Sequence, residues 1–116
     1  MSGGITGTDM ITQILIKKDV KFTKFTSQFA SFVNAVCRTW NFYASLVSPV
    51  ITSANDGKHM VGSLHYKDLA WDLRTNNLDS DRVAEIAHML RVDLGSDWDI
   101  VVEKDHLHCE YDKGGL

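Results

Sequence analysis

The spacing of hydrophobic residues changes along the chain, and each change predicts a different element of secondary structure. From Ser27, apolar residues recur at steps of three and four, which predicts an amphipathic helix capped by Ser27 itself; the apolar stripe is Phe29, Phe32, Val33, Val36 and Trp40. A second stripe predicts a helix capped by Asp79 or Ser80 and ended by Gly95 in a left-handed conformation; its members are Val83, Ile86, Ala87, Leu90 and Leu94. We expect both stripes to face the core.

Shorter apolar runs have the composition of β-strands. VITSA follows Pro49, and LAWDLR precedes the second helix. The tail WDIVVEKDHLHCEY holds two strand-like runs separated by Lys104 and Asp105, which predicts a hairpin. The runs QILIKK and VKFTKF fit strand or irregular structure equally well. This order predicts an α+β domain, a small antiparallel sheet with two main helices packed on it.

Length and charge limit the classes of protein that this chain can be. We expect a flexible N-terminal arm over residues 1–12 and one domain over residues 13–116, since 116 residues suffice for a single core. The net charge of -3, with no basic cluster larger than Lys17 and Lys18, excludes nucleic acid as an expected partner. No run approaches the ~20 apolar residues of a membrane span, and no secretory leader is evident. We expect a monomer made in the cytoplasm.

The C-terminal run HLHCEY places polar groups on one face of its predicted strand. Because alternate side chains share a face, His106, His108 and Glu110 point one way, whereas the intervening Leu107, Cys109 and Tyr111 suit the core. His65 and Asp72 offer another imidazole and a carboxylate from the segment before the second helix. Three such ligands and a water form a catalytic zinc site. The spacing therefore indicates a zinc centre, with metal-free surface histidines as the alternative.

Two motifs in this order resemble a known family. SLHYKDLAWD (63–72) resembles the SxHxxGxAxD signature of the LAS-type zinc metallopeptidases, and DHLH (105–108) resembles their closing DHxH segment. That group includes zinc D-Ala-D-Ala carboxypeptidases, phage L-alanyl-D-glutamate endopeptidases and the related hedgehog N-domain. The similarity extends from about Val50 to Tyr111 and implies zinc held by His65, Asp72 and His108. It also implies a viral or phage peptidase that cleaves peptidoglycan stem peptides, acting on the cell wall after phage-type release or within a virion.

The resemblance also implies roles for the neighbouring residues. Asp105 matches the carboxylate three positions before the last ligand and is expected to be the general base, with His106 as a donor to the oxyanion. Glu103 competes for the role of base, because it stands three positions before His106 and would make His106 the ligand. Ser63 is expected near the substrate, or hydrogen-bonded to the carboxylate ligand.

The chain departs from the family pattern at two places. Asp68 replaces the signature glycine, and SANDGK lacks the arginine that binds the substrate's terminal carboxylate in many carboxypeptidases. Lys58 can supply a point charge there, and His59 either contacts the substrate or lies on the surface. The missing arginine favours an endopeptidase over a carboxypeptidase, whereas Asp68 bears on the geometry of the loop. We expect Arg74 to pair with a nearby carboxylate.

Two further hypotheses compete with an enzyme. The chain is alternatively a zinc-binding interaction module without turnover, or a structural virion protein with no metal.

Overall fold

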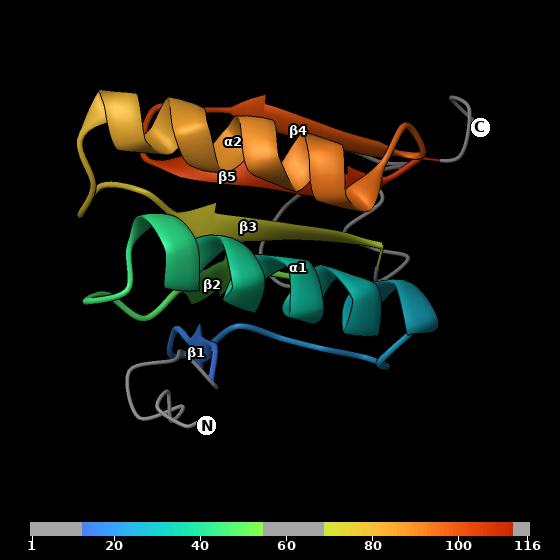
Figure 1. The fold of residues 1–116 in the computed structure, drawn as a ribbon. Helices are drawn as coiled ribbons and strands as arrows, with labels where there is room; N and C mark the ends of the chain where they lie inside the picture. The colour runs from blue at the N-terminus through green and yellow to red at the C-terminus, as the bar shows by residue number, and fades with distance from the viewer. Residues whose placement is uncertain (1–12, 55–68, 113–116) are drawn as a thin grey trace, which may run out of the picture.

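Two helices pack on one face of a five-stranded sheet in the computed structural model, which describes residues 13–54 and 69–112 (Figure 1). The elements in chain order are β1 (Leu15–Ile16), α1 (Ser27–Tyr43), β2 (Val50–Ser53), β3 (Ala70–Arg74), α2 (Ser80–Leu94), β4 (Trp98–Val102) and β5 (His106–Tyr111). The strand order is β1-β2-β3-β5-β4. The predicted α+β class, with two helices on one sheet, is therefore confirmed.

The sheet is mixed rather than purely antiparallel. Strands β2, β3, β5 and β4 pair antiparallel with their neighbours, but β1 runs parallel to β2. This pairing is held by hydrogen bonds from the Leu15 N–H to the Pro49 carbonyl and from the Lys17 N–H to the Ile51 carbonyl, each 2.9 Å long. Of the two ambiguous N-terminal runs, only residues 15–16 form a strand, and residues 20–25 remain irregular.

The helix ends follow local capping chemistry, with one correction to the sequence interpretation. The N-cap of α1 is Thr26 and not Ser27: the Thr26 hydroxyl accepts a hydrogen bond of 3.1 Å from the Phe29 N–H. The cap residue must have an extended backbone, and Ser27 is already helical. In α2 the cap is Asp79, which accepts from the Arg82 N–H at 2.8 Å.

Gly95 ends α2 with φ 92° and ψ -175°. The positive φ was expected, but this ψ lies outside the left-handed helical region and is a conformation that essentially only glycine adopts.

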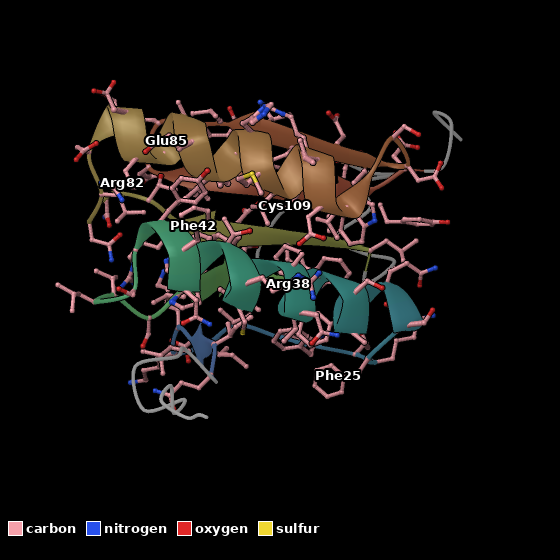
Figure 2. All side chains as sticks on the ribbon, in the orientation of Figure 1. Phe25, Arg38, Phe42, Arg82, Glu85 and Cys109 are labelled. Carbon is pink, nitrogen blue, oxygen red and sulfur yellow. The ribbon has the colours of Figure 1, made fainter. Side chains whose placement is uncertain are left out.

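The core lies between the helices and the sheet. Phe32 of α1 stacks on Trp71 of β3 with ring centroids 5.0 Å apart, and Leu107 and Cys109 of β5 are buried in the same cluster. Figure 2 shows the sulfur of Cys109 in the layer between the sheet and the helices. Burying each large apolar side chain contributes roughly 1.5–3 kcal/mol, so this cluster determines which face of each strand is turned inward. The alternate residues of β3 and β5 consequently face away from the helices.

No helix among the described residues is both long and apolar enough to cross a membrane.

Candidate metal centre

Asp72 and His108 lie directly opposite each other on neighbouring strands. The register of β3 and β5 pairs Asp72 with His108, one position from the buried pairs on either side of it. Because Trp71, Leu73, Leu107 and Cys109 are turned towards the helices, both polar side chains emerge on the opposite face of the sheet. Their facing atoms, His108 Nδ1 and Asp72 Oδ1, are 3.0 Å apart. The fold thus brings together two residues 36 positions apart in the sequence.

A second carboxylate holds the other end of the His108 ring. Glu110 Oε1 lies 2.6 Å from His108 Nε2. A neutral imidazole has only one N–H, so hydrogen bonds to two carboxylates favour the doubly protonated ring. The hydrogen bond with Asp72 is the main reason that the pKa of His108 rises to about 9; burial opposes this rise, and Glu110 adds to it. The sequence analysis gave Glu110 no role, although the alternation in HLHCE already placed it on the same face.

His106 connects Asp72 to the hairpin loop. Its Nδ1 lies 2.7 Å from Asp105 Oδ1, and its Nε2 lies 3.8 Å from Asp72 Oδ2. The hydrogen bond with His106 is the main cause that lowers the pKa of Asp105. The Asp105 carbonyl also accepts a hydrogen bond of 3.0 Å from the N–H of buried Thr75, which ties the loop to the end of β3. Carboxylates and imidazoles therefore alternate across this face, from Asp105 to Glu110.

The geometry of Asp72 and His108 fits a zinc ion. Zinc–ligand distances of about 2.0–2.2 Å and tetrahedral angles place two ligand atoms roughly 3.3–3.5 Å apart. The observed 3.0 Å between Asp72 Oδ1 and His108 Nδ1 needs only a small opening to reach that value. With Nδ1 bound to metal, the Nε2–H would donate to Glu110, the carboxylate–histidine–metal arrangement that orients many metal ligands.

The remaining predicted residues fall partly outside the described structure. Lys58, His59, Ser63 and His65 lie between residues 55 and 68, for which no structure is described. The structure therefore brings together two of the three predicted metal ligands. Within residues 13–54 and 69–112, no group of three His, Cys, Asp or Glu side chains is arranged to hold a metal.

The choice between the two candidate bases can be judged by position. Glu103 lies exposed in the hairpin loop; its side chain makes no hydrogen bond or ion pair with any described residue, while its N–H donates to the His106 carbonyl at 2.9 Å. Asp105, in contrast, lines the same hollow as Asp72. His108 also lies closer to Asp72 than His106 does. These positions favour Asp105 as the base and His108 as the metal ligand, and both roles stay predictions.

The hollow beside Asp72 has a volume of about 270 Å³. Asp72, Asp105 and His106 line one part of it, and Lys17 and Arg74 bring positive charge to it. The ion pair expected for Arg74 is not formed with any residue of the described segments. The two carboxylates in the same hollow are instead within reach of histidine rings.

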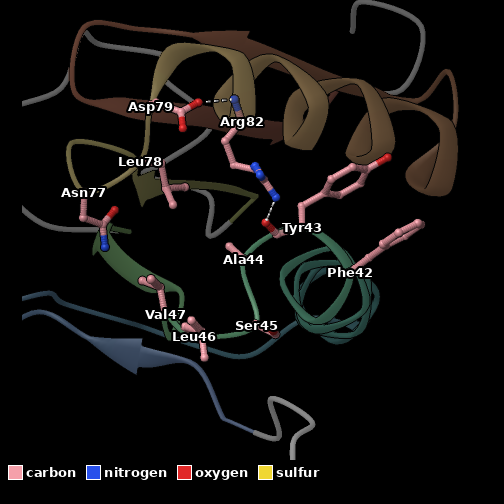
Figure 3. A pocket seen from close by; sticks show the side chains of 10 residues that line it. All are labelled: Phe42, Tyr43, Ala44, Ser45, Leu46, Val47, Asn77, Leu78, Asp79 and Arg82. Atoms are coloured by element: carbon pink, nitrogen blue, oxygen red, sulfur yellow. Dashed lines mark hydrogen bonds between the residues drawn. The ribbon is translucent and has the colours of Figure 1, made fainter.

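A second hollow, of about 400 Å³, lies where α1 ends and α2 begins (Figure 3). Here the Arg82 guanidinium donates to the Tyr43 carbonyl and so ties α2 to the end of α1, while the Asp79 carboxylate caps α2. The described residues that line it include no histidine or cysteine, which leaves the face of β3 and β5 as the better candidate for metal chemistry.

The fold and the paired polar residues define an α+β domain of the type shared by LAS-type zinc peptidases and the hedgehog N-domain. The family model for the Hedgehog amino-terminal signalling domain matches residues 17–110, and the chain belongs to this family.

Individual relatives match a shorter stretch. Indian hedgehog protein of Xenopus laevis is 39% identical over 54 residues, and Sonic hedgehog protein of Danio rerio is 37% identical over 54 residues. Each alignment covers 47% of this chain but only 13% of the relative. The comparison therefore shows the domain family, and the aligned region is a small part of each hedgehog protein.

Proposed function

We propose that this hedgehog-type domain binds one zinc ion through His65, Asp72 and His108 and hydrolyses peptide bonds. The observation that carries the proposal is the contact of 3.0 Å between Asp72 and His108, which face each other on the open side of the sheet. His65, seven positions before Asp72 in a segment resembling the peptidase signature, is the proposed third ligand. Three protein ligands leave a fourth tetrahedral position for water or substrate.

The residues around the proposed centre can move protons for hydrolysis. When bound, zinc lowers the pKa of a coordinated water and polarises a carbonyl group. Asp105 is the proposed base that accepts the proton of the attacking water and delivers it to the leaving amine. The contact of 2.7 Å with His106 orients the Asp105 carboxylate and lowers its pKa, which favours the ionised form that a base requires. His106 is the proposed donor to the carbonyl oxygen, and Glu103 is the alternative base.

We propose peptidoglycan stem peptides as the substrate class. This step rests on the resemblance of SLHYKDLAWD and DHLH to the peptidase motifs. The protein would then meet its substrate in the cell wall, after phage-type release or within a virion.

A zinc-binding interaction module is the second candidate. Two observations favour it: the matching family is described as a signalling domain, and the Asp105 carboxylate already engages His106 rather than standing free. In this case zinc would stabilise the fold by mass action, without turnover.

Two measurements on one protein sample separate these candidates. Zinc content is measured for the wild type and for His65→Gln and His108→Gln, which should each lose the metal. The zinc-loaded wild type is then incubated with purified peptidoglycan, with and without chelator, and newly exposed amino groups are quantified. Chelator-sensitive release that Asp105→Asn abolishes, with zinc retained, supports the peptidase. If Glu103→Gln abolishes this release and Asp105→Asn does not, Glu103 is the general base. One bound zinc per chain, with no release of amino groups from any type of peptidoglycan, supports the zinc-binding interaction module.

A further inference from the structure

Two cations line the hollow beside the candidate centre without a partner among the described residues. Arg74 extends from the end of β3, and Lys17 follows β1. Neither side chain makes a hydrogen bond or an ion pair within residues 13–54 and 69–112. We propose that Lys17 and Arg74 form a subsite that binds a carboxylate of the peptide ligand. This inference rests on the proposed function, because it assigns the ligand that the zinc centre would act on or hold.

The backbone fixes both cations relative to Asp72. Arg74 is two positions after Asp72 on the same face of β3, which corresponds to about 6.7 Å along the strand. Lys17 is held beside β2, since its N–H donates to the Ile51 carbonyl at 2.9 Å and its carbonyl accepts from the Val20 N–H at 3.2 Å. The backbone of both residues is therefore held by the sheet.

The charges of the hollow leave these cations available for a ligand. Asp72 is a proposed metal ligand, so its negative charge would be offset by the ion. Asp105 is engaged by His106 at 2.7 Å. What remains is the positive charge of Lys17 and Arg74. Arg74 is a half-buried residue, and its guanidinium group has the fork of donors that matches a carboxylate.

The spacing limits where the carboxylate stands in the ligand. An extended peptide spans about 3.3–3.6 Å per residue, so this separation along the strand corresponds to about two residues of a ligand whose carbonyl lies at the metal. Two sources of carboxylate satisfy this spacing: the free C-terminus of a short peptide, and an acidic side chain next to the reacting bond. The Thr52 hydroxyl and the Asn76 amide, which line the same hollow, add neutral hydrogen-bonding groups for the adjoining backbone.

The test compares three dipeptides that carry a carboxylate at the C-terminus, a carboxylate on the side chain, or no carboxylate. N-acetyl-alanyl-alanine carries a free C-terminus, N-acetyl-alanyl-glutamate amide carries a side-chain carboxylate, and N-acetyl-alanyl-glutamine amide carries neither. Binding of each is measured by NMR titration to zinc-loaded and to metal-free protein. The variants are Arg74→Gln and Lys17→Gln, with Arg38→Gln and Lys24→Gln as matched controls on other parts of the surface. The variant Arg74→Lys keeps the positive charge but removes the paired N–H donors of the guanidinium group.

We expect at least one carboxylate probe to bind more tightly than the neutral probe, and the tighter of the two identifies the source. Arg74→Gln should weaken the binding of that probe about tenfold or more, since hydrogen bonds to charged groups are the stronger kind. Binding of the neutral probe should be unchanged. Arg74→Lys should recover part of the affinity. Equal affinity for all three probes, or equal losses in Arg74→Gln and Arg38→Gln, would overturn the subsite. Absence of zinc binding would refute the proposed function separately, and the probe comparison on metal-free protein would still decide the subsite.

Discussion

The ring of His108, held between Asp72 and Glu110, should make the stability of the metal-free protein depend on pH. The pKa of His108 is raised to about 9 in the folded state, mainly by Asp72, whereas an unfolded histidine titrates near its ordinary value of about 6.5. Between these values the folded state binds more protons than the unfolded state, so the free energy of unfolding must fall as pH rises. The stabilisation is fully present below about pH 6.5 and is lost as pH approaches 9.

The magnitude follows from the size of the shift. One pKa unit corresponds to about 1.4 kcal/mol, so raising the pH from 6.5 to 8.5 removes at most about 3 kcal/mol. The His108 side chain is 22% exposed, and solvent screening reduces this value, so we expect a loss of about 1–3 kcal/mol.

The assay is urea unfolding at pH 6.5 and 8.5 in the presence of chelator. His108→Gln serves as the control, because it lacks the titrating ring and should show a flatter dependence. Staying below pH 9 also limits the contribution of Cys109, whose thiol pKa is raised by burial. If the wild type loses no more stability than His108→Gln over this range, Asp72 and Glu110 do not raise the pKa of His108 as described.

Three further substitutions test other parts of the structure. Glu110→Gln should weaken zinc binding about tenfold by releasing the ring of His108, whereas Glu85→Gln on α2 should leave it unchanged; competitive chelator titration measures both, and equal affinities would contradict the role of Glu110. Gly95→Ala should lower the free energy of unfolding by about 1–3 kcal/mol, because an added Cβ meets open space but φ 92° is strained for alanine; a neutral effect in urea unfolding would contradict this. Leu107→Ala should cost about 2–5 kcal/mol in the same assay, since this side chain is fully buried, and a loss below 1 kcal/mol would show that the site collapses without a cavity.

Periodicity was sufficient to predict both helices and most of the sheet. The stripe containing Val83, Ile86 and Leu90 is buried as expected, because a three-to-four-residue spacing places apolar groups on one side of a helix wherever that helix packs. The hairpin of β4 and β5 was equally predictable from alternation. The parallel pairing of β1 was not, since it depends on only two residues, Leu15 and Ile16, and on hydrogen bonds to a distant strand.

The sequence predicted which side chains of the candidate site share one face of the sheet, but it did not predict their contacts. Alternation placed His106, His108 and Glu110 together, but only the register of β3 against β5 shows that Asp72 stands opposite His108. The contacts of the His108 ring with Asp72 and Glu110 depend on rotamers, which sequence spacing does not specify. The same holds for Arg74, where the presence of acidic neighbours suggested an ion pair. Those neighbours contact histidines instead.

The most direct test of the zinc centre is the metal content of the protein after dialysis against micromolar zinc, measured by atomic emission for the wild type, Asp72→Asn and His108→Gln. His88→Gln, which removes an exposed histidine on α2, is the matched control. Our account predicts one zinc per chain in the wild type and in His88→Gln, and little or none in the other two. A wild type that retains no zinc, or zinc retained equally by all four proteins, would contradict it.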